Sequence, residues 1–483
     1  MPSTPAADGL DEITIRALQD GYASGRWTCA EVVENYLRRI DHAQSSAGGH
    51  AGIVAVNPRA RESAERLDEY ARREGRPLGA LHGVPIVVKD QFDSIDVPTA
   101  FGSRVVRPRL ADADAPVVRR LRAAGAIVLA KATMADLGLS LFSKSSLSGY
   151  TENPYDRTRD VGGSSSGCAA AVADNLCVGA IGIDSSGSVR LPASFTSLVG
   201  FRPTIGLVDA AGASPILPMQ DVPGPLARSV ADAAALFEAM RRRPGVAEPT
   251  DGRDSSTRPS LHGLRIGVLR LPLRHDLDQD AVQVEAIMAQ AAVDLCRLGA
   301  ELVHVCAPRQ RGDRRAAAGP VIRGQLAEYF SRRPHFGVSS PEHLVDGGGA
   351  DLLELLAGPE ADARMLTALL EDRVKRRIAL VAMLRRHGVD AVCYPSAMLP
   401  APTIADLEWG RWNTRSFPAL TWLAAQAGAP AIAVPAGFTA QGLPVGLELL
   451  AAPLADLVLM RIADGYERVT RKRRAPRAQR APA

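Results

Sequence analysis

The sequence predicts an α/β fold with a largely parallel β-sheet covered by helices on both faces. Short apolar runs alternate with amphipathic segments along most of the chain, which is typical of this class. The 483 residues are 46% hydrophobic and 23% charged, so the chain is long enough and apolar enough to bury a large core. We find no internal repeat, which argues against a solenoid.

The chain opens with helical patterns. Two amphipathic helices come first, and the second begins at Thr28, which forms a capping box with Glu31 ahead of an apolar stripe. A strongly charged third helix is predicted over residues 58–73.

Further along the chain, strands and helices alternate. The strand-like runs are apolar and short, and they are Val84–Val88, Ala126–Ala130, Val178–Ile183, Arg265–Leu269, Leu302–Cys306, Asp390–Tyr394, Ala431–Val434 and Val445–Leu450. The helical segments lie near Ala115–Ala124, Gly167–Asn175, Ser229–Arg241, Asp280–Leu298 and Met365–His387. The polar, Pro- and Gly-rich stretch 242–261 is predicted to be a surface loop.

Charge and cysteine content exclude several function classes. The net charge of +4 includes six basic residues in the last 13, so the body is close to neutral and predicts no nucleic-acid partner. We therefore expect one domain over 1–470 and a basic, disordered tail over 471–483. Six scattered cysteines indicate no disulfide framework. No signal peptide or membrane span is visible, which predicts a cytoplasmic protein without membrane partners.

Two loops rich in glycine and serine are the most unusual feature. The first, VGGSSSG (161–167), runs into a helix of small residues, and the second, DSSGSVR (184–190), follows an apolar strand. Such loops supply hydroxyls and backbone N–H groups for acyl transfer, or N–H groups for a phosphate. No G-x-x-x-x-G-K-[ST] motif supports the phosphate interpretation.

Lys89 stands directly after a buried-looking strand. The chain has only five lysines among its 57 basic residues, and arginine would serve equally well for a surface charge. Burial can lower a lysine pKa enough to make the amine a general base. Alternatively, Lys89 reaches solvent from the strand end or pairs with Asp90.

A second serine scheme competes at the first loop. The run Gly163 to Gly167 matches the G-x-S-x-G nucleophile elbow, which would make Ser165 the nucleophile and would require a partner such as His387. None of the nine histidines lies at metal-ligand spacing, so we expect neither metal nor cofactor.

Several long motifs follow one another along the chain. They are LHGVPIVVKDQFD (81–93), DAPVVRRLRAAGAIVLAKATM (114–134), NPYDRTRDVGGSSSGCAAAVADNL (153–176), GAIGIDSSGSVRLPASFTSLVGFRPT (179–204), DVPGPLARSVADAAAL (221–236) and GAPAIAVPAGFTAQGLPVGLELL (428–450). In this order they resemble the amidase signature family of serine hydrolases. The resemblance runs from about residue 10 to 468.

The resemblance implies the fold and the catalytic residues. The family's fold has a large central mixed, mostly parallel sheet. The implied triad is Lys89 as base, Ser164 after a cis peptide bond, and Ser188 as nucleophile. The implied oxyanion hole comprises the backbone N–H groups of Ser185, Ser186, Gly187 and Ser188, and the implied supporting residues are Asp184, Arg190, Gly163 and Ser165. Ser186 stands where the family usually has glycine, so a positive φ there would carry strain.

The resemblance also implies an amide substrate. The family cleaves aryl, alkyl and peptide amides, and some members cleave carbamates (urethanes) or esters. A variable region over about 270–425 is expected to form the substrate pocket, with Trp409, Trp412, Phe417 and Met134 as candidate lining residues. We expect a small-molecule amide or carbamate substrate and a monomer or homodimer. Two alternatives are a glutaminase component of a tRNA-dependent amidotransferase and a non-catalytic binding protein on this scaffold.

Overall fold

The computed structural model describes most of the chain. The described residues are 9–45, 52–242, 260–270, 279–306, 315–345, 352, 355–356 and 361–476. Most of the loop predicted over 242–261 therefore lies outside them, as do the last seven residues of the predicted tail.

Eleven strands form one mixed sheet. In spatial order they are β1 (Ile53–Val56), β3 (Ile127–Ala132), β2 (Pro85–Lys89), β6 (Gly179–Asp184), β8 (Val222–Ala227), β7 (Val199–Arg202), β12 (Ala431–Phe438), β13 (Pro444–Ala451), β11 (Ala391–Pro395), β9 (Arg265–Arg270) and β10 (Glu301–Cys306). Parallel pairing joins β3, β2 and β6 on one side and β11, β9 and β10 on the other, and the strands between them pair antiparallel. A short hairpin, β4 (Glu152–Asn153) and β5 (Asp156–Asp160), stands apart.

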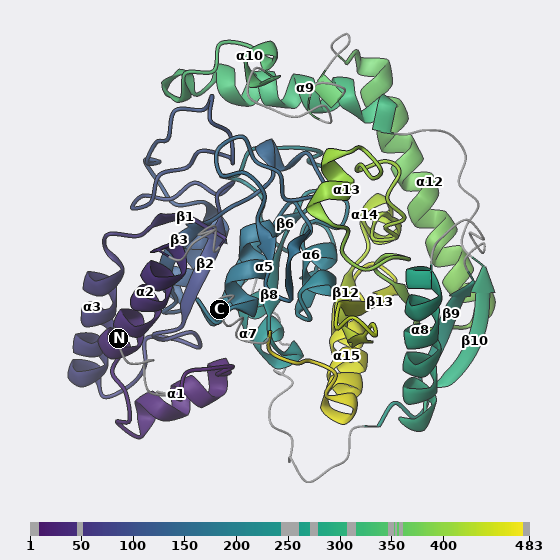
Figure 1. The fold of residues 1–483 in the computed structure, drawn as a ribbon, viewed down its shortest axis with the longest axis horizontal. Helices are drawn as coiled ribbons and strands as arrows, with labels where there is room; N and C mark the ends of the chain where they lie inside the picture. The colour runs from purple at the N-terminus through teal and green to yellow at the C-terminus, as the bar shows by residue number, and fades with distance from the viewer. Residues whose placement is uncertain are drawn as a thin grey trace.

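Helices flank this sheet, as predicted. Those described are α1 (Ile15–Ala23), α2 (Cys29–Ser45), α3 (Ala60–Glu74), α4 (Pro116–Ala123), α5 (Ser166–Ala173), α6 (Arg190–Phe195), α7 (Val230–Met240), α8 (Gln279–Arg297), α9 (Arg315–Ser331), α10 (Pro341–Val345), α12 (Ala363–His387), α13 (Ile404–Glu408), α14 (Trp422–Ala427) and α15 (Asp456–Thr470). Helices α5 and α6 contact each other on the central strands, while α7 groups with α1, α4 and α15. Figure 1 shows α9 and α10 across the top of the molecule, above β1–β3.

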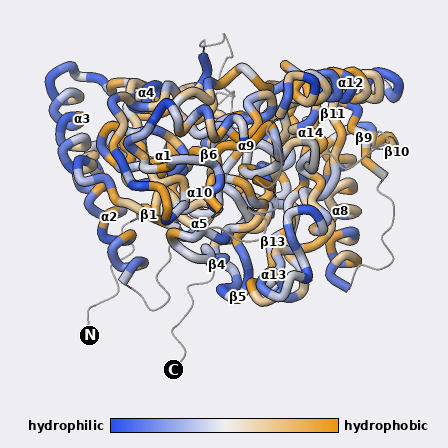
Figure 2. Tube along the Cα trace, turned by 90° about the horizontal axis from the view of Figure 1, so that it is seen from above, coloured by the Kyte–Doolittle hydropathy of each residue, from blue (hydrophilic) through white to orange (hydrophobic). Residues whose placement is uncertain are grey.

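The core follows the hydropathy of the elements. The central strands β2, β3 and β6 are buried along their whole length, which explains why they read as unbroken apolar runs. In contrast, α3 buries only Ala60 and Ala64 and is largely hydrophilic in Figure 2. A second apolar cluster joins Phe101 to α9 and α10 and includes Ile216 and Leu217. It packs that helical layer onto the rest of the protein.

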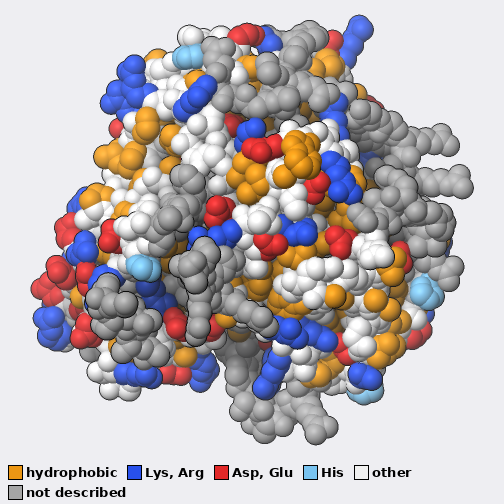
Figure 3. Space-filling view, viewed as in Figure 1, with side chains coloured by type: hydrophobic (Ala, Val, Ile, Leu, Met, Phe, Trp, Pro, Cys, Tyr) orange, Lys and Arg blue, Asp and Glu red, His pale blue; other side chains and the backbone are white. Residues whose placement is uncertain are grey.

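Surface charges are mixed. On the face shown in Figure 3, Lys and Arg side chains are interspersed with Asp and Glu. None of the described helices combines the length and the apolar character needed to cross a bilayer.

The described part of the predicted tail, residues 471–476, differs from the expectation of a disordered segment. Arg473 forms an ion pair with Glu12 at 2.8 Å and donates to the Ser197 carbonyl at 2.8 Å. Lys472 Nζ lies 3.5 Å from a carboxylate oxygen of Asp294. The tail itself contains no acid, so these basic residues were expected to be solvated. Their acidic partners instead lie far away along the chain.

Candidate active site

The two serine-rich loops lie at one edge of the sheet because of strand pairing. Strands β2 and β6 are parallel neighbours, so Lys89 at the end of β2 and Asp184 at the end of β6 lie at the same edge. Residues 185–189 then lead into α6, and residues 161–165 lead into α5. This topology gathers chemical groups from three segments separated in the sequence.

Lys89 is fully buried and contacts the first loop. Its Nζ lies 2.8 Å from Ser164 Oγ. Burial lowers the pKa of Lys89 to about 8, although Asp221 and Asp184 favour the charged form. With that pKa roughly a tenth of Lys89 is neutral at pH 7, and this fraction grows as the pH rises, as a general base requires.

The pairing of Lys89 with Asp90, considered as an alternative, does not occur. The Asp90 carboxylate lies 3.8 Å from Lys131 Nζ and accepts the backbone N–H groups of Ala100 and Gly102. Lys131 also donates to the Phe92 carbonyl and the Thr99 hydroxyl at 2.6 and 2.8 Å. Of the two buried lysines, Lys131 therefore has a structural role, and Lys89 contacts the Ser164 hydroxyl.

Ser164 follows a cis peptide bond from Gly163. Gly163 is required by space, because an added Cβ would lie 2.4 Å from the Phe142 carbonyl oxygen. Its backbone N–H donates to the Leu141 carbonyl at 2.7 Å. The backbone around the first serine is therefore held closely against residues 141–142.

Ser165 joins the two loops through its backbone. Its N–H donates to the Ser188 carbonyl at 3.2 Å, while its hydroxyl is buried and lies 3.5 Å from the Ile183 carbonyl. Among the described hydrogen bonds, none connects Ser165 to a histidine, and Ser165 does not line the cavity described below. This arrangement gives the nucleophile-elbow scheme no support.

Asp184 holds the second loop in shape. Its carboxylate accepts the N–H groups of Gly187 and Val189 at 2.9 and 3.2 Å and pairs with the guanidinium groups of Arg190 and Arg202. Burial disfavours its charge, but the two arginines outweigh burial and lower the pKa of Asp184 to about 2. The predicted supporting pair of Asp184 and Arg190 is thus a direct contact.

The peptide between Ser186 and Gly187 is fixed at both ends, which revises the predicted oxyanion hole. Asp184 takes the Gly187 N–H, and Thr421 Oγ1 donates to the Ser186 carbonyl at 2.7 Å. The Gly187 N–H is therefore unavailable to a substrate. The residue with a positive φ in this loop is Gly187, at 125°, and a Cβ there would come within 1.9 Å of Thr421 Oγ1. Ser186 does not have a positive φ, so the backbone strain considered for it does not arise.

Four supporting residues that surround Asp184 and Arg190 were missed by sequence reasoning. Arg202 on β7 contacts Asp184, Glu448 on β13 accepts from Arg190, Tyr394 on β11 donates to Glu448 at 2.8 Å, and Thr421 precedes α14. Three of them lie more than 200 residues beyond the loop. No local pattern marked them, although a buried arginine at position 190 requires a counter-charge and further hydrogen-bond acceptors.

Asp221 connects the second loop to an apolar wall. It accepts the Ser185 hydroxyl at 2.5 Å and the backbone N–H groups of Ile216 and Leu217 at 2.8 and 3.2 Å. Burial raises the pKa of Asp221, and these hydrogen bonds oppose that shift. One carboxylate therefore fixes both Ser185 and the segment that carries the two apolar side chains.

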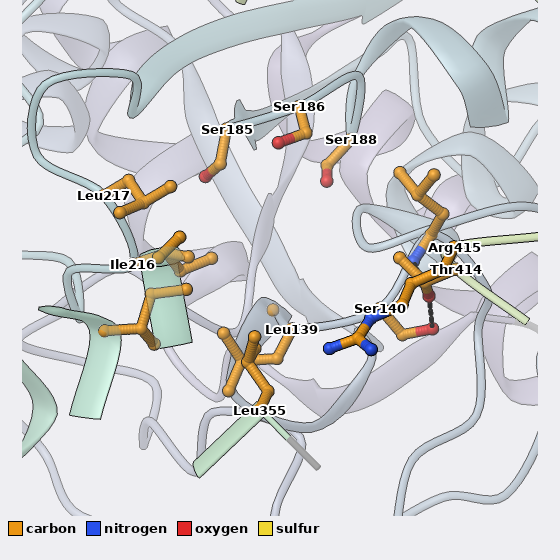
Figure 4. A pocket seen from close by; sticks show the side chains of 14 residues that line it. Leu139, Ser140, Ser185, Ser186, Ser188, Ile216, Leu217, Leu355, Thr414 and Arg415 are labelled. Carbon is orange, nitrogen blue, oxygen red and sulfur yellow. Dashed lines mark hydrogen bonds between the residues drawn. The ribbon is translucent and has the colours of Figure 1, made fainter. Parts of the chain in front are cut away.

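A cavity of about 80 Å³ opens at this loop. Ser185, Ser186 and Ser188 lie along one side of it, as Figure 4 shows, and Ile216 and Leu217 lie beside them. Leu139, Ser140, Thr414 and Arg415 border the opposite side. The candidate nucleophile Ser188 is thus exposed to a space that a small substrate group can enter.

The four candidate pocket residues do not line this cavity. Trp409 is 83% exposed, and Met134 is fully buried. Phe417 is buried against Phe142 and Trp412 in a separate apolar cluster. Aromatic residues near the site therefore support the backbone of residues 413–417, and aliphatic residues form the apolar wall.

Comparison with known proteins gives a consistent result. The Amidase family model matches residues 31–318 and 352–460. The chain is 32% identical to the A subunit of the glutamyl-tRNA(Gln) amidotransferase of Symbiobacterium thermophilum, over 94% of this chain and 96% of that protein. The native peptide amidase from Stenotrophomonas maltophilia is 32% identical, with a TM-score of 0.83 over 97% of this chain and 99% of that chain. A bacterial aryl acylamidase of the amidase signature family, at 21% identity and a TM-score of 0.80, shares the fold.

The fold and these matches define an amidase-type hydrolase acting on amide C–N bonds. The chain belongs to the amidase signature family. Within the described residues, no group of three His, Cys, Asp or Glu side chains is arranged to hold a metal ion.

Replacing Asp184 by asparagine is expected to destabilise the protein by about 3–5 kcal/mol, because two buried guanidinium groups lose a shared counter-charge. Equilibrium unfolding in urea measures this loss. Glu371→Gln, which removes an exposed ion pair with Lys375 on α12, is the matched control and should cost less than about 1 kcal/mol. Equal losses in the two variants would contradict a structural role for the buried cluster.

Proposed function

We propose that the protein hydrolyses small amides through an acyl-enzyme on Ser188. The observation that carries this proposal is the contact of Lys89 Nζ with Ser164 Oγ at 2.8 Å in a fully buried site. Ser165, the residue after Ser164, donates its backbone N–H to the Ser188 carbonyl, and Ser188 borders the cavity. These contacts support a proton path in which Lys89 is the base, Ser164 the relay and Ser188 the nucleophile.

In the proposed first step, the Ser188 hydroxyl oxygen bonds to the substrate carbonyl carbon. The Ser188 proton passes to Ser164 Oγ, whose own proton passes to neutral Lys89, which becomes an ammonium. General-base assistance of this kind contributes roughly 10²–10⁴-fold to a rate. The alkoxide-like oxygen that forms on the substrate then requires hydrogen-bond donors.

Three backbone N–H groups, those of Ser185, Ser186 and Ser188, are assigned to this oxyanion. The rigidity of the loop supports the assignment, because Asp184, Thr421 and Asp221 hold it before a substrate binds. Each preorganised donor of this type is worth about 2.7–4 kcal/mol of the barrier.

Collapse of the intermediate breaks the C–N bond. The proton held by Lys89 returns through Ser164 to the leaving nitrogen, and the amine departs. Water then attacks the acyl-enzyme with the same residues acting as base, and releases the carboxylic acid. The net reaction consumes one water for each amide cleaved.

The proposed substrates are alkyl or aryl amides with a modest acyl group, and carbamates and esters are candidate side substrates. The aliphatic wall formed by Leu139, Ile216 and Leu217 supports an apolar contact with the substrate.

Covalent labelling tests the nucleophile. A serine-directed fluorophosphonate should label the wild-type protein and the Ser165→Ala variant but not the Ser188→Ala variant. Mass spectrometry of the intact protein detects the label. Amide turnover should fall at least 10³-fold in Ser188→Ala and at least 10²-fold in Lys89→Ala. Labelling lost in Ser165→Ala but kept in Ser188→Ala would restore the elbow scheme, and no labelling at all would favour a binding protein.

The activity should depend on pH through Lys89. Because the neutral amine is the base and its pKa is about 8, kcat/KM should rise with pH through about 8 and level off above it. Stopped assays between pH 6 and 10 measure the profile, and circular dichroism at each pH shows that the fold persists. A profile that is flat from pH 6 to 9 would remove Lys89 from the role of base.

A glutaminase is the second candidate, and the similarity to the amidotransferase relatives favours it. In that case the chain alone should release little ammonia from glutamine, and adding the partner proteins of that enzyme and tRNA from a related bacterium should raise this rate strongly. Rapid hydrolysis of simple amides by the isolated chain, with no stimulation by those partner proteins, would reject this candidate.

A further inference from the structure

A further buried carboxylate, that of Asp160, lies beside the loop that carries Ser164. Asp160 is the last residue of β5, and its side chain is fully buried. One of its oxygens, Oδ1, accepts the Gly162 N–H at 2.6 Å, and Oδ2 accepts the N–H and the hydroxyl of Ser143 at 3.0 and 2.6 Å. A single carboxylate therefore joins the start of the Ser164 loop to residue 143.

The two segments that Asp160 joins also meet at a second point. The Gly163 N–H donates to the Leu141 carbonyl at 2.7 Å. On the other side of the loop, Gly162 has a φ of 82°, and a Cβ there would lie 3.0 Å from atoms of α6. The backbone that leads to Ser164 is thus confined between α6 and residues 141–143.

The backbone of Asp160 is itself held in place. Its N–H donates to the Pro402 carbonyl at 3.0 Å, and its carbonyl accepts the Asn153 side-chain amide at 3.3 Å. The carboxylate therefore projects from a fixed position. For this reason, a change in its hydrogen bonds should move the Ser164 loop rather than Asp160.

Hydrogen bonds alone compensate the charge of Asp160. Among the described residues, no cation forms an ion pair with it, and burial raises its pKa to about 6 while its hydrogen bonds to Ser143 and Gly162 oppose that shift. A buried carboxylate without a counter-charge is costly unless hydrogen bonds satisfy it. Above pH 7 the carboxylate is mostly ionised, so its oxygens accept all three donors where Lys89 becomes neutral.

We propose that Asp160 is a positioning residue that holds Ser164 Oγ against Lys89 Nζ. This inference rests on the proposed function, because it assumes that Ser164 relays the proton. The two atoms are 2.8 Å apart and both side chains are fully buried, so a shift of the loop acts directly on this contact. A misplacement of about 1 Å can cost roughly 10²-fold in rate. Asp160 does not line the cavity, so it acts through Ser164 and not on the substrate.

Asp160→Asn tests this role, because asparagine has the same shape but turns an amide N–H toward one of the N–H donors. We expect kcat for a small amide such as pentanamide to fall about tenfold or more, with KM changing less than about threefold. The rate constant for fluorophosphonate labelling of Ser188 should fall in parallel, while the final label stays at one per chain. A loss of folded protein would instead lower the final label and leave the rate constant unchanged.

A double-mutant cycle shows whether Asp160 acts through Ser164. In the Ser164→Ala variant there is no hydroxyl to position. Adding Asp160→Asn to that variant should therefore change the labelling rate constant less than about threefold. An effect unrelated to the relay would instead lower the rate by the same factor in both backgrounds.

Asp456 provides the matched control. It is buried at the start of α15 and accepts the N–H and the hydroxyl of Thr204 at 2.8 and 2.6 Å, the pattern that Asp160 forms with Ser143. Asp456→Asn should lower stability in urea but change the labelling rate constant less than about threefold.

Ser143→Ala is the milder variant and decides the question if Asp160→Asn does not fold. It removes the hydroxyl donor to Asp160 and keeps the backbone N–H. The labelling rate constant should fall about threefold to tenfold, the effect of one hydrogen bond, and this loss should also disappear in the Ser164→Ala background.

The outcomes distinguish the inference from the proposed function. Equal losses in the wild-type and Ser164→Ala backgrounds, or an unchanged labelling rate constant in Asp160→Asn, would overturn the inference and leave the acyl-enzyme mechanism intact. A loss in Asp456→Asn as large as that in Asp160→Asn would also overturn it. Absence of both amide turnover and Ser188 labelling in the wild-type protein would reject the proposed function itself.

Discussion

The site depends on a lysine enclosed by the protein without a carboxylate in hydrogen-bond contact. Two fully buried lysines stand on neighbouring strands and behave differently. Lys131 is surrounded by Asp90 and two oxygen acceptors, which stabilise its charge. Lys89 contacts a serine hydroxyl, and the acidic groups that act on it, Asp221 and Asp184, are bound to other partners. Burial lowers the pKa of both lysines. They differ in their partners, because Lys131 lies beside the Asp90 carboxylate, whereas Lys89 contacts a serine hydroxyl that can relay a proton.

A second constraint shapes the loop that must receive the substrate. Buried charges are unfavourable alone, so Asp184, Arg190, Arg202 and Glu448 form a connected cluster drawn from β6, α6, β7 and β13. This cluster removes the Gly187 N–H from the set of possible oxyanion donors and simultaneously fixes the backbone that presents the others. The loop is therefore ordered by charge pairing at its base rather than by contact with a substrate, as preorganised electrostatic stabilisation requires.

The sequence correctly predicted elements whose formation depends on residues close together in the chain. The buried strand expected over Val84–Val88 occurs at Pro85–Lys89, because an unbroken apolar run leaves little choice. In contrast, β8 was missed because Val222–Ala227 contains two prolines and a glycine, and α9 was missed because it contains Pro320. At the site, the resemblance to the amidase signature family, carried by contiguous motifs, indicated Lys89, Ser164 and Ser188. Thr421 and Glu448 carry no local signal, since they reach the loop only through tertiary packing.

The reacting groups and the wall that faces them across the cavity come from different parts of the fold. Among the reacting groups, Lys89 ends β2, Ser188 lies in the loop that follows β6, and Ser164 lies in the loop that precedes α5. The opposite wall comes from residues 138–141, from α9 and from the segment 413–417, each anchored by its own apolar cluster or hydrogen bonds. The wall that faces the serine loop is therefore built from segments other than those that form the buried charge cluster. This separation allows one hydrolytic machinery to serve substrates that differ in the group they carry beyond the amide.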